Sequence, residues 1–162
     1  MPDTDQIQPR LKVVAQIDYE NIVRDALVQG CLVDFEKLAQ LCREFGDLLT
    51  AYLYVPKHNS YDSWLDNAHQ QGFITVAVPL PANPARPKQH ENADSIMISH
   101  GRNLVEQGLD VLVIVTHDAD FLDLANFARN HGKQVVLVAG DKVSRVLVRA
   151  VDTILSLPTK SP

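Results

Sequence analysis

Two aspartates separated by a single residue follow the most apolar stretch of the chain. Residues 111–115 are all apolar, and Asp118 and Asp120 come directly after them, in the segment from Thr116 to Phe121. A short apolar run of this kind is typical of a strand buried on both faces of a parallel sheet. Ligand sites in such sheets lie just outside the carboxyl ends of the strands. The spacing therefore favours chemistry at the two aspartates, with helix capping by one of them as the alternative.

Two further carboxylates stand in comparable positions. Asp18 follows a second strand-like run at residues 11–17. Asp94 lies near the start of a helix that we expect to begin near Asn92, and it heads the face that packs inward. At helical spacing this face contains Ala93, Asp94, Met97, Ile98, Gly101, Leu104 and Val105. A carboxylate turned towards a core needs a cation, a hydrogen-bond donor or a metal ion.

These four side chains are expected to converge on one pocket. Asp18, Asp94, Asp118 and Asp120 have no obvious cationic partner nearby in the sequence. Clustered carboxylate oxygens are ligands for hard divalent ions, so the pattern predicts a Mg²⁺ or Mn²⁺ site.

Size and composition indicate one globular domain. The chain has 162 residues, of which 46% are hydrophobic and 22% charged, as is usual for soluble proteins. Its net charge of −5 argues against charge-driven coating of nucleic acid, but not against a nucleic-acid enzyme with a metal-binding acidic site. We expect neither a secretory leader nor a bilayer-spanning segment. Cys31 and Cys42 lack metal-type spacing, which predicts free thiols and a cytoplasmic protein.

Strand and helix patterns alternate along the chain. Strands are predicted at 11–17, 50–55, 73–78, 111–115 and 134–139, with an edge strand at 152–156. Helices are predicted at 33–46, 60–71, 92–105, 121–131 and 142–149. This alternation predicts an α/β fold with three layers, α/β/α, around a central, mainly parallel sheet of about five strands. We expect a tail at residues 1–10, one domain at 11–157 and a second tail at 158–162. The proline-rich stretch 79–90 is predicted to be a long loop.

The order of these residues resembles that of the NYN domain, a branch of the PIN-like nucleases. Asp18 and Asn21 follow the first strand, Asp94 opens a middle helix, and Thr116 to Phe121 follows the fourth strand. The resemblance implies the three-layer fold and a metal-dependent ribonuclease using Mg²⁺ or Mn²⁺. It also implies that Asp18, Asp94, Asp118 and Asp120 are the catalytic metal ligands, and that Asn21 and Thr116 orient a carboxylate or the substrate.

The chain departs from many members of that family at two places. Relatives often have Ser-Gly before the paired aspartates, where this chain has Thr116 and His117. Thr116 keeps a hydroxyl near the metal, whereas His117 either lines the pocket or faces solvent. Relatives also often carry a lysine shortly before the middle aspartate, where this chain has Glu91, its nearest lysine being Lys88. Glu91 is either a fifth acid of the site or a helix-start residue interacting with the macrodipole.

Basic residues near the expected site are candidates for phosphate contacts. Arg86, Lys88 and His90 lie in the proline-rich loop before Asp94, and Lys142 and Arg145 follow the last main strand. The alternative for each is an ordinary surface charge. The expected partner is RNA, single-stranded or structured. No membrane contact is expected, and a homo-oligomer is left open.

Two other functions compete with the nuclease. Asp118 and Asp120 also resemble the nucleophile and acid/base of haloacid dehalogenase-like phosphatases, although that motif normally follows the first strand. The second alternative is a non-catalytic RNA-binding or assembly module that has kept the fold.

Overall fold

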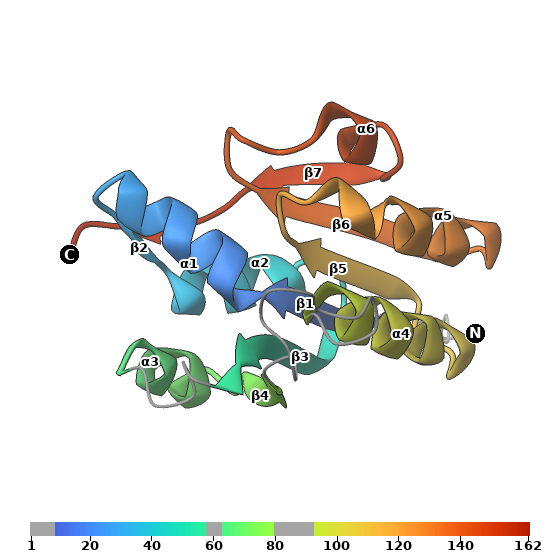
Figure 1. Cartoon of the computed structure of the whole chain (residues 1–162). Coiled ribbons are helices and arrows are strands. Elements are labelled where there is room, and N and C mark those ends of the chain that lie inside the picture. The colour runs from blue at the N-terminus through green and yellow to red at the C-terminus, as the bar shows by residue number, and fades with distance from the viewer. Residues whose placement is uncertain (1–8, 58–62, 80–92) are drawn as a thin grey trace, which may run out of the picture.

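A sheet of six parallel strands forms the centre of the molecule (Figure 1). The computed structural model describes residues 9–57, 63–79 and 93–162. The strand order is β4-β3-β1-β5-β6-β7. The bounds of these strands are Lys12–Asp18 (β1), Asp47–Pro56 (β3), Ile74–Val78 (β4), Val111–Val115 (β5), Gln134–Ala139 (β6) and Thr153–Ser156 (β7).

Helices cover both faces of this sheet and create two separate cores. One core contains side chains of α1, α2 and α3, and the other contains side chains of α4, α5 and α6. The helices span Tyr19–Val28 (α1), Phe35–Arg43 (α2), Trp64–Gln70 (α3), Ala93–Glu106 (α4), Leu122–Asn130 (α5) and Arg145–Val148 (α6). The expected three-layer α/β/α architecture is confirmed.

Successive side chains of the central strands point alternately into the two cores. In β5, Val113 and Val115 pack into the first core while Leu112 and Ile114 pack into the second. All residues of β5 are buried, because successive side chains point to opposite faces and each face is covered by helices. This explains why the sequence shows an uninterrupted apolar run here.

The structure differs from the sequence-based prediction in three elements. The main sheet has six strands rather than about five, because the expected edge strand forms as β7. Helix α1 was not predicted. Leu32–Val33 (β2) pairs antiparallel with Thr159–Lys160 (β8), which sequence analysis had placed in a tail. Within the described residues, none of the helices has the length and apolarity required to cross a bilayer.

The strand order positions the candidate site. Strands β1 and β5 are neighbours in the middle of the sheet, and the chain continues from β1 towards β3 but from β5 towards β6 on the opposite side. The loops after β1 and β5 therefore diverge, which leaves a crevice at the carboxyl edge of the sheet where ligands of such folds bind. Asp18 is the last residue of β1, and Asp118 lies three residues beyond the end of β5.

Candidate metal centre

Three of the four predicted acids form one cluster. Asp94, Asp118 and Asp120 each offer a carboxylate oxygen, and the three oxygens lie within 4.8 Å of one another. Asp94 comes from the first turn of α4, whereas Asp118 and Asp120 come from the loop and short 3₁₀ turn after β5. Asp94 and Asp120 also line an open hollow between α4 and the start of α5.

Asp18 lies beneath this cluster and is tied to it by Thr116. Its carboxylate is only 6% exposed, and its Oδ2 accepts a hydrogen bond of 3.1 Å from Thr116 Oγ1. The same hydroxyl oxygen accepts a hydrogen bond of 3.2 Å from the backbone N–H of Asp118. Thr116 therefore acts as donor and acceptor at once, and it fixes the end of β5 relative to Asp18.

Asp118 also has a local structural role. Its Oδ1 accepts a hydrogen bond of 2.9 Å from the backbone N–H of Asp120, so it caps the 3₁₀ turn Ala119–Phe121. The capping alternative is thus confirmed for this residue. Capping does not account for Asp120 or for the approach of Asp94, because a cap requires only one carboxylate.

Burial and mutual repulsion perturb two of the acids strongly. Burial, with added repulsion from Asp18, Asp118 and Asp120, raises the pKa of Asp94 from 3.8 to about 8. Burial also raises the pKa of Asp18 from 3.8 to about 6, although the Thr116 hydrogen bond opposes the shift. Among the described residues, none of the ion pairs joins a lysine or arginine to the clustered acids. Crowded oxygen ligands that have no lysine or arginine ion pair among the described residues fit a hard divalent ion.

Asn21 and His117 connect α1 with the loop after β5. The Asn21 side chain accepts a hydrogen bond of 3.0 Å from the backbone N–H of His117. The His117 ring is 8% exposed, and its Nε2 accepts a hydrogen bond of 2.7 Å from the backbone N–H of Gly140. The expectation that this histidine faces solvent or lines the metal pocket is therefore wrong, because the ring packs against Gly140 and Asp25.

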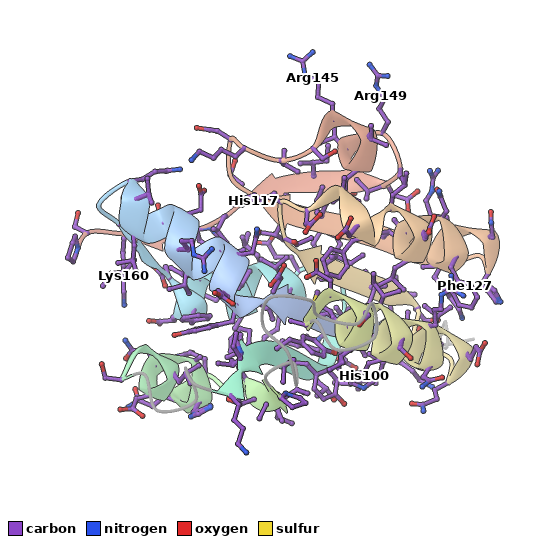
Figure 2. All side chains as sticks on the ribbon, viewed as in Figure 1. His100, His117, Phe127, Arg145, Arg149 and Lys160 are labelled. Carbon is purple, nitrogen blue, oxygen red and sulfur yellow. The ribbon has the colours of Figure 1, made fainter. Side chains whose placement is uncertain are left out.

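The basic residues predicted to contact phosphates have different surroundings. Lys142 Nζ lies 3.5 Å from Asp25 Oδ1. Arg145 is exposed and extends outward from α6 (Figure 2). Arg86, Lys88, His90 and Glu91 lie outside the described residues.

Sequence analysis missed a buried polar network next to the cluster. Gln16 of β1 is fully buried, and its amide contacts Tyr54 of β3, whose hydroxyl contacts His100 of α4. A glutamine inside an otherwise apolar strand was the available signal, because a buried amide requires hydrogen-bonding partners.

Comparisons with known proteins agree with the fold. The NYN domain family model matches residues 12–158. The uncharacterized protein MJ0482 of Methanocaldococcus jannaschii is 26% identical over 132 residues, which cover 80% of this chain and 48% of that protein. The chain thus spans about half the length of this curated relative. The crystal structure of VPA0982, a protein of unknown function from Vibrio parahaemolyticus, superimposes with a TM-score of 0.79 at 16% identity, covering 94% of this chain and 96% of that chain. At this identity the likeness shows the fold alone.

Proposed function

Because this chain belongs to the NYN domain family, whose members are generally nucleases, we propose that it is a metal-dependent ribonuclease. The observation that carries the proposal is the cluster of Asp94, Asp118 and Asp120, whose oxygens lie within 4.8 Å of one another. Three carboxylates in such proximity repel one another, and a divalent ion removes that repulsion.

The ligand set follows from this geometry. Asp94, Asp118 and Asp120 would hold Mg²⁺ or Mn²⁺, with Asp18 as a deeper carboxylate behind them. When bound, the ion activates a water, neutralises phosphoryl oxygens and stabilises the leaving oxygen of a phosphodiester. Asp94, whose raised pKa lets it retain a proton near neutral pH, would give up that proton on binding the ion.

The surrounding residues hold these ligands in place. The Thr116 hydroxyl donates to Asp18 and accepts from the Asp118 backbone, which sets the separation of the two carboxylates. The Asn21 side chain holds the backbone of the same loop through His117. These contacts to a carboxylate and to the backbone support an orienting role for Thr116 and Asn21.

The test is cleavage of single-stranded and structured RNA, with DNA controls, in the presence of Mn²⁺, Mg²⁺ or EDTA. We expect cleavage of RNA with either metal and none in EDTA. Asp118→Asn is the matched control, since asparagine caps a helical turn as well as aspartate does but removes the charge. Cleavage that survives in EDTA, or that Asp118→Asn retains, would contradict the metal-centre proposal.

The same assay separates the alternatives. Binding of RNA without cleavage under every metal condition would favour the non-catalytic module. Hydrolysis of phosphate monoesters without cleavage of RNA would favour the phosphatase, an alternative to which the family match lends no support.

A further inference from the structure

A chain of buried polar groups runs from the interior of the sheet to the surface of α4. The Gln16 amide nitrogen donates a hydrogen bond of 2.9 Å to the backbone carbonyl of Met97 and one of 2.7 Å to the Tyr54 hydroxyl. The Tyr54 hydroxyl in turn contacts His100 Nδ1 at 2.5 Å. Burial of polar groups costs free energy, so we expect this network between β1, β3 and α4 to serve a function.

The hydrogen bonds of this network favour one set of directions. The Met97 carbonyl can only accept, so the group of Gln16 that faces it must be the NH₂ group. Tyr54 accepts the other N–H of that group, and its own proton is then best satisfied by His100 Nδ1, the acceptor in contact with the hydroxyl. The Gln16 carbonyl oxygen then faces Gly101, where a Cβ would lie only 2.5 Å from it, so a larger residue is excluded at this position.

This arrangement selects one tautomer of His100. Since Nδ1 accepts the Tyr54 proton, the neutral ring carries its hydrogen on Nε2. Burial lowers the pKa of His100, which keeps the ring neutral, and burial raises the pKa of Tyr54, which keeps the phenol protonated. Tyr52 packs edge-on against the imidazole, with ring centroids 4.6 Å apart, and restricts its rotation. His100 therefore presents a fixed, uncharged N–H donor.

His100 borders a hollow whose lining groups can form hydrogen bonds with the edge of a nucleobase. Its described lining, on the outer side of α4, is Ser95, Ile96, Ser99, His100 and Asn103. None of these described side chains carries a fixed charge, so the described lining lacks the arginine or lysine that contributes most to the attraction of phosphate. Hydroxyl, amide and imidazole groups instead suit the edges of unpaired bases, which proteins read in single-stranded RNA.

This hollow adjoins the one beside the candidate metal centre. Ser95 lines both this hollow and the one that contains Asp94 and Asp120. His100 is six residues from Asp94, about 9 Å along the helix axis, or two to three stacked nucleotides at about 3.4 Å each. A strand whose phosphate lies at the carboxylates can therefore place a neighbouring base over this part of α4.

We propose that His100, held as its Nε2–H tautomer by Gln16 and Tyr54, donates a hydrogen bond to an unpaired base of an RNA strand bound across α4. This proposal rests on the proposed ribonuclease function, and it assigns to α4 a role in sequence preference. Gln16 and Tyr54 are positioning residues, because they act through His100.

The first measurement concerns the tautomer and needs no activity. In the metal-free wild-type protein, the imidazole ¹⁵N shifts of His100 should identify protonated Nε2 and unprotonated Nδ1. Addition of single-stranded RNA should shift the Nε2 resonance. Tyr54→Phe keeps the aromatic ring but removes the proton donor, so the His100 tautomers should become mixed. A ring protonated on Nδ1 in the wild type would overturn the proposal.

The second measurement is the affinity for homopolymeric A, C, G and U single strands, in an Asp118→Asn background that prevents cleavage. Wild-type His100 should give unequal affinities. His100→Asn, which retains a side-chain group near Nδ1 but not near Nε2, should reduce the ratio of strongest to weakest binding by about twofold to tenfold. His100→Gln restores a donor near Nε2 and should recover part of that ratio. His69→Ala, at an exposed histidine of α3, is the control and should leave the ratio unchanged.

The outcomes distinguish this proposal from the proposed function. Equal affinities in the wild type, absence of RNA binding, or an unchanged ratio in His100→Asn would overturn the base-binding role even if Mn²⁺-dependent cleavage is found. An altered ratio in a protein that cleaves no RNA would retain the base-binding role and refute the nuclease.

Discussion

Aspartates at the carboxyl edge of the sheet have two different environments. On one side of β5, the Asp25 side chain is 11% exposed and has Lys142 Nζ at 3.5 Å. On the other side, the oxygens of Asp94, Asp118 and Asp120 approach within 4.8 Å and lack a described lysine or arginine partner. A buried carboxylate requires a compensating charge. Lys142 supplies that charge to Asp25, whereas the clustered acids would receive theirs from the divalent ion proposed above.

The largest effect is expected from a change in the cluster of Asp94, Asp118 and Asp120. Asp118→Asn should reduce cleavage at least about a hundredfold, since even outer-shell changes at metal sites cost 10- to 100-fold. In EDTA its free energy of unfolding should be unchanged or higher, because the cap is retained and a repulsive charge is lost. Cleavage assays and chemical denaturation check the two parts. A clear loss of stability in EDTA would mean that Asp118 is a structural anion, as Asp25 is.

Removal of the Thr116 hydroxyl should have the next largest effect. Thr116→Val preserves the shape but leaves Asp18 Oδ2 and the Asp118 N–H without this partner. We expect a loss of about 1–3 kcal/mol in stability and a reduction of about 10- to 100-fold in cleavage. Thr116→Ser, which retains the hydroxyl, should restore most of both. Equal defects in the two variants would show that the methyl group matters rather than the hydrogen bonds.

The clustered acids should also make the metal-free protein sensitive to pH. The pKa values of Asp94 and Asp18 are about 8 and about 6 in the folded protein, against 3.8 for an ordinary aspartate. Between about pH 4 and about pH 8, the folded state therefore binds more protons than the unfolded state. Its stability falls as the pH rises through this range. Thermal unfolding in EDTA across this range checks the slope. Asp94→Asn should flatten it, and saturating Mg²⁺ should oppose the decline. A stability that rises over the same range would contradict the repulsion.

The smallest effect is expected at the ion pair of Asp25 with Lys142. Lys142→Met should lower stability by no more than about 1 kcal/mol, because the ammonium group is largely exposed. If Lys142 serves Asp25, RNA cleavage and the salt dependence of RNA binding should not change. Arg149→Ala, at a nearby exposed cation that sequence analysis did not select, is the matched control. A salt slope reduced by about 0.7 in Lys142→Met would instead identify the phosphate contact for which sequence analysis named Lys142 as a candidate.

The sequence predicted those features that leave a periodic or local signal. Apolar runs located the main strands, and a carboxylate directly after each of two runs located the edge at which Asp18 and Asp118 lie. The helix from Tyr19 to Val28 was missed although Tyr19, Ile22, Val23 and Ala26 follow helical spacing and Gly30, with φ 73°, comes just after its end. Strands of two residues, such as β2 and β8, are too short to show a period.

Long-range polar contacts could not be predicted in the same way. The hydrogen bond between Thr116 and Asp18, and the chain from Gln16 to His100, join residues of different elements. Their partners depend on strand order, which residue spacing does not encode. The same holds for His117, whose burial against Gly140 results from the neighbouring position of β6.

The contact between Asp18 and Thr116 joins residues 98 positions apart in the chain. Closing so long a loop carries an entropic cost, so pairing of β1 with β5 belongs to a late stage of folding. Synthesis proceeds from the N-terminus, and a growing chain that has made β1, β3 and β4 still lacks all three of its clustered aspartates. The ribonuclease proposed above would thereby be inactive while most of it is being translated, next to the message that encodes it.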